Sequence, residues 1–416
     1  MGIGPTSPAW KAEVLPLNYT RTSIKRNYII SKFFSCVNNY LLFFYVCCIF
    51  GNGFIYYSMG KTINYIIDRS RLIHNIQCIK SLLNNNTKLC AIVKANAYGV
   101  GVKQVCECIL DHVDYLAVAS VIEAREIRQF EALKPIVVLG EVDDSDISYC
   151  VSHNVDISVS SVDRLRCLIK VLDKCILNIH VKIDTGLNRY GIKEISQLKK
   201  IIAICKKSKC INPCGLMTHF ATKSSDIDFI DAQYNKFIEF AKLTPNVICH
   251  CANSYATIHD QKYHLDMCRV GFYMYGMTES ECKDLLPVVS IQSKIMYIHK
   301  VKKGETIGYD RTFVADKDMT VVVVGMGYAD GLNRRLSNNF CLLVKGEYVP
   351  IVGNICMDCC MVDCTGLKIQ EGDLVTILGN DGNKKITLCD HAKSAGTSEY
   401  EILLKFNQHR MKIVCK

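Results

Sequence analysis

Between residues 90 and 271 the sequence alternates short apolar runs with helix-like segments, and this alternation limits the fold more than any other feature. Helical periodicity is clearest in Lys193–Cys205 and in Asp226–Leu243, which begins with an aspartate. Strands that alternate with helices pair in parallel, and eight such units predict a (β/α)8 barrel whose site lies at the C-terminal strand ends. The eight runs with strand character are Cys90–Val93, Tyr115–Ala119, Pro135–Leu139, Asp156–Val159, Ile176–Ile183, Cys214–His219, Val247–Cys251 and Met267–Gly271.

The pattern changes after about residue 285, where helical periodicity gives way to strand-like runs separated by turn signals. One short helix-like stretch, Leu388–Ala395, falls among these runs. The sequence therefore predicts an α/β protein, with a (β/α)8 TIM-type barrel over residues 59–285 and a mostly β C-terminal domain over residues 286–416. The strand-like runs of the second domain are Val288–His299, Met319–Met326, Phe340–Val344, Tyr348–Ile351 and Leu374–Leu378.

Residues 1–58 have a different character. Lys25, Arg26 and Lys32 precede a continuous apolar run, Tyr40–Phe50, whose eleven residues are too few to span a bilayer as a helix. Basic residues before a short apolar run resemble a signal peptide, but the basic cluster comes late and no small-x-small cleavage site follows. We expect a leader or a spurious extension here rather than a membrane anchor.

Composition narrows the function classes. The formal net charge of +10 comes from scattered lysines and arginines, which predicts a solvated surface rather than nucleic-acid binding. The 24 cysteines are scattered and often lie inside apolar runs, which indicates buried thiols in a reducing cytoplasm rather than disulfides. The local cluster Cys356, Cys359 and Cys360 lacks a second ligand pair at zinc-site spacing, so we expect no metal.

Lys94 stands at the C-terminal end of the first predicted barrel strand, and a turn-prone Asn96 and Gly99 follow it. An ammonium group in a partly dry pocket loses its proton easily, and the free amine is then a nucleophile and a base. Forming an imine with a carbonyl cofactor is one standard use of such a lysine. The alternative is a strand-end lysine that simply extends its ammonium group to water.

The run Val93–Gly99, V-K-A-N-A-Y-G, closely resembles the cofactor-lysine motif of alanine racemases, the fold-type III enzymes that use pyridoxal phosphate (PLP). The family usually continues G-H-G where this chain has Gly99-Val100-Gly101. At least six separated motifs match in order, so the resemblance runs from about residue 60 to residue 416. The family normally begins close to Met59.

The resemblance implies roles for residues at the barrel's strand ends. The segment Lys182–Gly191 resembles K-x-D-T-G-M-x-R-x-G of the family. By that resemblance Arg189 sits near the cofactor's phenolic oxygen, and Lys182 matches a lysine that is carbamylated in many members. His219 matches the family's T-H-F-A pattern. Without the resemblance, Arg189 would be read as a loop residue and His219 as a structural histidine.

Two further strand ends imply contacts with the cofactor. Arg269 matches the arginine that hydrogen-bonds the pyridine nitrogen. Because arginine accepts no proton, the ring would stay neutral, which favours simple reprotonation over transamination. Gly271 lets the backbone approach the phosphate closely. Ser254 opens a helix and offers donors that suit a phosphate, a role compatible with an ordinary N-cap. The expected cofactor-binding residues are Lys94, Tyr98, Ser254, Arg269, Gly271, Phe272 and Tyr400.

The β domain holds the remaining expected residues. By the resemblance, Tyr309 is the second catalytic base, although its segment alone would be read as a hairpin with an aromatic residue. A tyrosine has an ordinary pKa of about 10, so activity near neutrality needs a shift of roughly three units. The family's source of that shift is a relay from Arg269 through His219. The expected substrate-binding residues are Arg189, Met357 and Asp358.

The resemblance implies PLP-dependent interconversion of L-alanine and D-alanine, which supplies D-alanine for peptidoglycan. Lys94 would take the proton from D-alanine and Tyr309 from L-alanine, on opposite faces. The family completes each site with the β domain of a second subunit, so we expect a cytoplasmic homodimer with shared sites. Pocket size, which the sequence does not fix, leaves open a racemase of serine or another small amino acid. A non-catalytic PLP-binding homeostasis protein is the other alternative.

Overall fold

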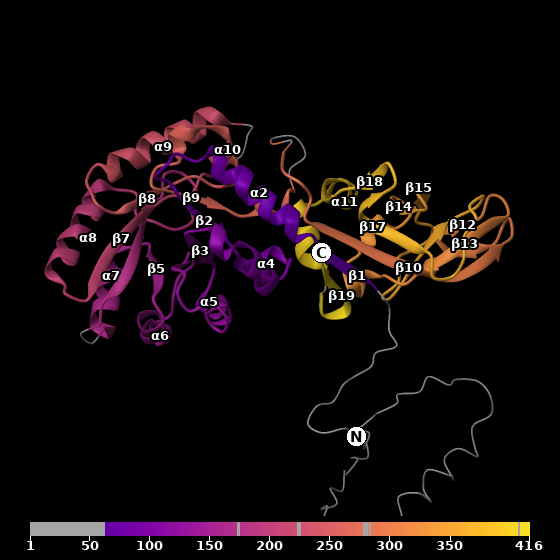
Figure 1. The fold of residues 1–416 in the computed structure, drawn as a ribbon, viewed down its shortest axis with the longest axis horizontal. Helices are drawn as coiled ribbons and strands as arrows, with labels where there is room; N and C mark the ends of the chain where they lie inside the picture. Colours follow the sequence, from indigo (N-terminus) through magenta and orange to yellow (C-terminus); the bar gives the residue numbers. More distant parts are fainter. Residues whose placement is uncertain (1–62, 173–174, 223–225, 278–281, 283, 407) are drawn as a thin grey trace, which may run out of the picture. The chain divides into compact units, whose positions relative to one another are not determined.

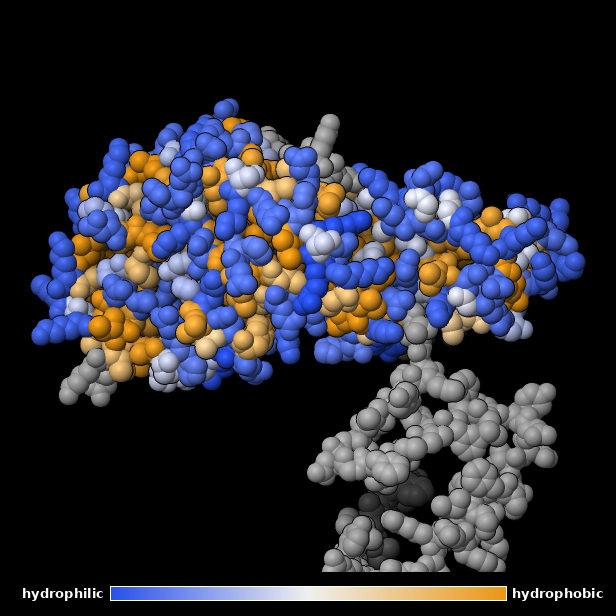
Figure 2. Space-filling model, in the orientation of Figure 1, coloured by the Kyte–Doolittle hydropathy of each residue, from blue (hydrophilic) through white to orange (hydrophobic). Residues whose placement is uncertain are grey.

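The computed structural model describes residues 63–172, 175–222, 226–277, 282, 284–406 and 408–416. The predictions for residues 1–58 therefore lie outside the described residues. No helix within these ranges combines the length and the apolar character that crossing a membrane requires. On the face shown in Figure 2, hydrophilic and apolar side chains are interspersed. Every described cysteine is a free thiol, and many of them are buried.

The eight predicted barrel strands are all present and pair in parallel in the order β8-β7-β6-β5-β4-β3-β2-β9. Between β8 and β9, Asp266 N–H donates to Cys249 O and Arg269 N–H donates to Ala252 O, each at 3.1 Å. These two bonds nearly close the barrel. The strands are β2 (Lys88–Ile92), β3 (Tyr115–Val118), β4 (Ile136–Val138), β5 (Val155–Val159), β6 (Leu177–Lys182), β7 (Ile211–Met217), β8 (Ile248–His250) and β9 (Met267–Val270).

Helices lie outside these strands, as Figure 1 shows for α4 to α9. The aspartate expected to open α9 does so, because the Asp226 carboxylate caps the helix by accepting from Phe229 N–H at 3.1 Å. The barrel helices are α2 (Arg69–Leu82), α4 (Val102–Ile109), α5 (Val121–Arg128), α6 (Ile147–Ser152), α7 (Val162–Val171), α8 (Ile195–Lys207), α9 (Ile227–Ala241) and α10 (Ser254–His259).

The barrel interior divides into an apolar half and a polar half. Strands β2, β3, β4 and β9 supply the apolar cluster Cys90, Ile92, Ala117, Val137 and Met267. Strands β5, β6, β8 and β9 supply buried polar side chains, which is unusual because barrel interiors are mostly filled by branched apolar residues. These polar side chains are Asp156, Ser158, His180, His250 and Arg269.

The C-terminal part is a β-rich domain, as predicted. Its main sheet has the order β15-β14-β17-β10-β1-β19, and β13 pairs with β10 and β16. The predicted runs correspond to β10 (Val289–Val301), β13 (Met319–Val324), β14 (Cys341–Val344), β15 (Glu347–Pro350) and β17 (Leu374–Asp381), and the predicted helix is α11 (Leu388–Ala395). The sequence did not predict β11 (Thr306–Ile307), β12 (Phe313–Val314), β16 (Cys360–Asp363), β18 (Lys384–Ile386), β19 (Lys412–Cys415) or α12 (Glu399–Lys405).

Strand β1 (Asn64–Ile67) belongs to this C-terminal sheet, although the sequence grouped its residues with the barrel. It lies antiparallel to β10, with Asn64 beside Gln292, and parallel to β19, with Asn64 beside Lys412. The described part of the chain therefore begins in the β-rich sheet, crosses to the barrel and returns to that sheet. The predicted boundary at residue 285 stays a prediction.

Candidate active site

Lys94 lies two residues beyond β2, half-buried at the C-terminal end of the barrel, as expected from the sequence. It lines a cavity of about 240 Å³ together with Lys182, Arg189, His219 and Arg269. Burial lowers the pKa of the Lys94 ammonium group, and the nearby charge of Arg189 lowers it further. Both effects favour the free amine that attacks carbonyl groups.

The turn after Lys94 is left-handed, which the sequence did not predict. Ala95, Asn96 and Ala97 have φ of 52°, and Tyr98 has φ of 59°. Each L-residue in this conformation costs about 1–2 kcal/mol. One side chain from α5 and one from the turn itself hold it in this conformation. The Glu123 carboxylate accepts from Ala95 N–H at 2.7 Å, and Asn96 Oδ1 accepts from Val102 N–H at 2.7 Å. Strain that the surroundings enforce is typical of functional sites.

Lys182 and Arg189 flank the cavity opposite this turn. Burial, and then the charges of Arg189 and Arg269, lower the pKa of Lys182 to about 8. The Lys182 ammonium donates to Leu139 O and lies 5.1 Å from the ring centroid of Tyr190. The Asp184 carboxylate shapes the loop that carries Arg189 by accepting from Gly186 N–H and Asn188 N–H, each at 3.0 Å.

Arg269 and His219 meet as the resemblance implied. The Arg269 guanidinium is buried, and one of its nitrogens lies 3.4 Å from His219 Nδ1. The same guanidinium donates to Thr218 O at 2.7 Å and to His250 O at 2.8 Å, which fixes its plane. Burial, and then the charge of Arg269, lower the pKa of His219 to about 3. His219 is itself exposed, at the cavity, and because arginine can only donate, its Nδ1 faces Arg269 as an acceptor, which also makes the ring a neutral imidazole.

A second group of predicted residues forms a cradle of backbone and hydroxyl groups. Gly271 N–H donates to Ser254 Oγ at 3.0 Å. A Cβ atom at Gly271 would collide with the Tyr98 hydroxyl, so only glycine fits there. Tyr400, from α12, stacks on Phe272 with ring centroids 4.0 Å apart. One expectation needs correction: the N-cap of α10 is Asn253, and Ser254 is the first helical residue. The Ser254 hydroxyl is therefore used by Gly271 rather than by its own helix.

The predicted residues of the β domain do not line the Lys94 cavity, whose described lining comes entirely from the barrel. Tyr309 is 69% exposed and Met357 is 54% exposed. They belong to neighbouring loops, because Asn354 Nδ2 donates to Tyr309 O at 3.1 Å. Asp358, on the same loop, pairs with Arg410 at 2.6 Å. The structure thus assembles the predicted residues into three groups: the lining of the Lys94 cavity, the cradle around Gly271, to which Tyr400 comes from α12, and the exposed loops of the β domain.

Sequence reasoning missed Glu123 and the buried polar residues Asp156, His180 and His250. Glu123 gave a local signal, since Ser120 and Glu123 form a capping box at the start of α5. That pattern predicts the helix start but not the bond to Ala95. Asp156 and His180 are polar residues within largely apolar strands, and this pattern could have identified them as candidates from the sequence.

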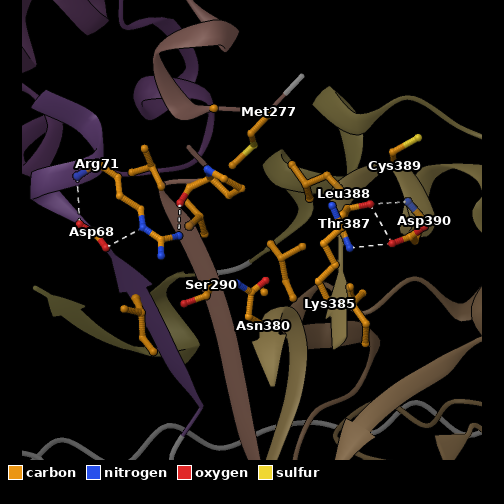
Figure 3. A pocket seen from close by; sticks show the side chains of 18 of the residues that line it. Asp68, Arg71, Met277, Ser290, Asn380, Lys385, Thr387, Leu388, Cys389 and Asp390 are labelled. Carbon is orange, nitrogen blue, oxygen red and sulfur yellow. Dashed lines mark hydrogen bonds and ion pairs between the residues drawn. The ribbon is translucent and has the colours of Figure 1, made fainter. Parts of the chain in front are cut away.

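A larger cavity of about 850 Å³ contains none of the predicted site residues. Figure 3 shows two sets of paired polar groups in this cavity, one around Arg71 and one around Asp390. Arg71 pairs with Asp68 at 3.1 Å and donates to Pro287 O at 3.0 Å, and Thr387 bonds to Asp390. Because Lys94 lines the smaller cavity and not this one, the smaller cavity is the candidate active site.

Comparison with known proteins identifies the family of the chain. A family model described as "Alanine racemase, N-terminal domain" matches residues 67–279, and one described as "Alanine racemase, C-terminal domain" matches residues 288–414. The chain is 36% identical over 351 residues to alanine racemase 2 of Caldanaerobacter subterraneus subsp. tengcongensis, covering 81% of this chain and 90% of that protein.

Solved structures give the same result. The fold is similar to that of alanine racemase from E. faecalis, with a TM-score of 0.82 and 28% identity over 86% of this chain and 98% of the other. It is also similar to alanine racemase from Bacillus anthracis with bound L-Ala-P, with a TM-score of 0.80 and 30% identity over 86% and 95% of the two chains.

Proposed function

Because this chain belongs to the alanine racemase family, we propose that it interconverts L-alanine and D-alanine with PLP held at Lys94. The observation that carries this proposal is the lysine of lowered pKa that shares its cavity with the buried Arg269. No observation on the described residues favours another amino acid or a non-catalytic role. The D-alanine would serve peptidoglycan synthesis, and a cytoplasmic location stays a prediction from cysteine usage.

The residues around the cavity fit PLP. Lys94 would carry the cofactor through its amine, and Arg189 would meet the phenolic oxygen. Ser254 and the backbone at Gly271 would meet the phosphate, beside Tyr98, Phe272 and Tyr400. When bound, the cofactor would acidify the α-proton of the amino acid. The Arg269 guanidinium would donate a hydrogen bond to the pyridine nitrogen of the cofactor without transferring a proton to it.

Two bases on opposite faces then move the proton. Lys94 would take it from D-alanine, and the partner subunit's Tyr309 would take it from L-alanine. His219, neutral and next to Arg269, would contact that tyrosine hydroxyl and favour its deprotonation. Met357 and Asp358 would lie with Tyr309 at the entrance, near the substrate carboxylate.

The exposure of Tyr309 supports a homodimer with shared sites. Tyr309, Tyr328 and Met357 are large side chains, each more than 40% exposed on neighbouring loops of one domain. Such a patch is typical of an interface. A second copy whose patch covers the Lys94 cavity would bring the two groups of residues together.

Chiral analysis of D-alanine formed from L-alanine by the purified protein tests the activity. A complementation experiment tests the sharing. Lys94→Ala and Tyr309→Phe are each expected to be inactive as homodimers. In a refolded equimolar mixture, half the dimers combine both variants, and each of these holds one intact site if Tyr309 acts in the partner's cavity. The mixture should then recover about a quarter of wild-type activity, as expected for a twofold dimer.

No recovery in the mixture would contradict the sharing of sites, because residues that act within one chain leave no intact site in any dimer. Size-exclusion chromatography of both variants serves as the control that they still associate.

A further inference from the structure

Arg269 is a buried cation without a carboxylate in direct contact among the described residues. Its guanidinium bonds to the carbonyl oxygens of Thr218, His250 and Cys251 and to the rings of His219 and His250. Burying an uncompensated charge is costly, so a counter-charge is expected within reach.

A hydrogen-bonded chain leads from Arg269 to such a charge. Arg269 lies 2.9 Å from His250 Nδ1, His250 Nε2 lies 2.9 Å from His180 Nδ1, and His180 Nε2 lies 3.3 Å from Asp156 Oδ2. All four residues are at most 4% exposed. The chain crosses the polar half of the barrel interior, from β9 through β8 and β6 to β5.

The donors of this chain all point the same way. Arginine can only donate, so His250 Nδ1 accepts from it. Burial and the charge of Arg269 hold the pKa of His250 well below its usual range, so its single proton is on Nε2. His180 Nδ1 therefore accepts, and His180 Nε2–H donates to Asp156. Two neutral imidazoles link a cation to an anion, an arrangement in which each bond polarises the next.

We propose that Asp156 is a positioning residue of the racemase, the counter-charge that acts through His180 and His250 to orient and polarise the Arg269 guanidinium. The inference rests on the proposed function, because Arg269 affects the reaction only if it meets the cofactor. Asp156 itself lies on β5, away from the residues that line the Lys94 cavity.

The Asp156 end of this hydrogen-bonded chain also has the side chains of a possible metal site. Asp156, His180 and Cys214 present oxygen, nitrogen and sulfur atoms within 4.8 Å of one another, which is a possible metal-ligand group. Hydrogen bonds already account for these atoms, however. Asp156 also accepts from Asn178 Nδ2 at 2.9 Å, and the Cys214 thiol donates to Ile179 O at 3.5 Å. The chain thus explains the cluster without an ion.

The test compares Asp156→Asn with two matched controls in the complete chain. Asn178→Ala removes another hydrogen bond to Asp156 and leaves the charge, and Cys214→Ala removes the thiol. Asp156→Asn should lower kcat by about tenfold and leave KM for alanine unchanged. A loss of this size is typical when a residue that orients a ligand-binding side chain is removed. Both controls should keep kcat.

Histidine-labelled NMR supplies a readout independent of turnover. In protein without cofactor, the downfield imidazole N–H signal of His180 should move upfield in Asp156→Asn, and that of His250 should move with it. His180→Gln assigns the signals, and it breaks the same chain at the next link if Asp156→Asn does not fold. Its kcat should then fall as well.

The two proposals fail in different ways. An unchanged kcat and an unmoved His250 signal in an active enzyme would overturn the role of Asp156 alone. A wild-type protein that neither binds PLP nor racemises alanine would overturn the proposed function, whereas the NMR signals would still report the chain. If the wild-type protein holds one equivalent of zinc and Cys214→Ala holds none, then Asp156, His180 and Cys214 are metal ligands, and the inference is overturned.

Discussion

At the scale of single residues, Glu123 links three backbone groups around the reactive lysine. Its carboxylate accepts from Ala95 N–H and Ala119 N–H, each at 2.7 Å, and from Ser120 N–H at 3.3 Å. Its charge also raises the pKa of Lys94, against the larger effect of burial. The Glu123 side chain on α5 thus holds the strained turn and limits how far the pKa of Lys94 falls.

Replacing Glu123 with Gln should therefore lower the pKa of Lys94 further, because the opposing charge of Glu123 is removed while burial and the charge of Arg189 remain. Competitive acetylation of the protein without cofactor, followed by mass spectrometry across a pH series, measures this pKa. Glu126→Gln, an exposed carboxylate on the same helix, is the control. A Lys94 titration that shifts equally in both variants, or only in the control, would contradict the assignment.

At the scale of elements, the left-handed turn α3 (Lys94–Tyr98) is the departure from ordinary geometry that matters most for the site. Its backbone is held by Glu123 and by the Asn96 side chain, and at its end Leu403 of α12 lies against Gly99 while Gln408 Nε2 donates to Gly99 O at 2.6 Å. Several contacts from distant parts of the chain thus enforce a conformation that the local sequence disfavours.

Ala95→Gly should raise the thermal midpoint, because glycine adopts φ of 52° without the penalty of about 1 kcal/mol that alanine carries. Ala203→Gly is the matched control, at an exposed position in the right-handed helix α8, and should lower the midpoint through a loss of about 1 kcal/mol. Differential scanning calorimetry of both variants checks the signs. A loss at both positions would mean that the turn is not strained.

The elements that the sequence predicted are those with a strong local pattern. Most barrel strands are largely apolar runs, and α11 has the periodicity and cap that mark a helix. Strands β1 and β19 were missed because each has four residues and is defined by partners far away in the chain. The left-handed turn was missed because tertiary contacts create it. Tyr309 could be predicted only by resemblance, since the described chain leaves its side chain exposed.

At the scale of the whole molecule, buried neutral histidines make stability depend on pH. His391, on α11, is buried and donates to Ile377 O at 2.8 Å, and burial lowers its pKa to about 4. The unfolded chain, with an ordinary histidine pKa, binds more protons below about pH 6.5. Stability is therefore lost as the pH falls from about 6.5 toward about 4.

His391→Gln should flatten this dependence, because glutamine can keep the bond to Ile377 O and does not titrate. Between pH 7 and pH 5 the histidine costs about 2 kcal/mol, so the variant's thermal midpoint should fall by a few degrees less than that of the wild type. His299→Gln, at an exposed position, should show the wild-type fall. Equal falls in all three proteins would show that His391 titrates normally when folded.

The pairing of β1 between β10 and β19 has a consequence for synthesis on the ribosome. Asn64 emerges early, but the residues beside it, Gln292 and Lys412, are translated much later. The barrel can begin to form as its units emerge, whereas one backbone edge of β1 stays unpaired until β10 is available and the other until β19 is available. Pairing with β19 thus completes the backbone hydrogen bonds of β1. A polypeptide truncated before Lys412 would expose an unpaired strand edge that is prone to aggregation.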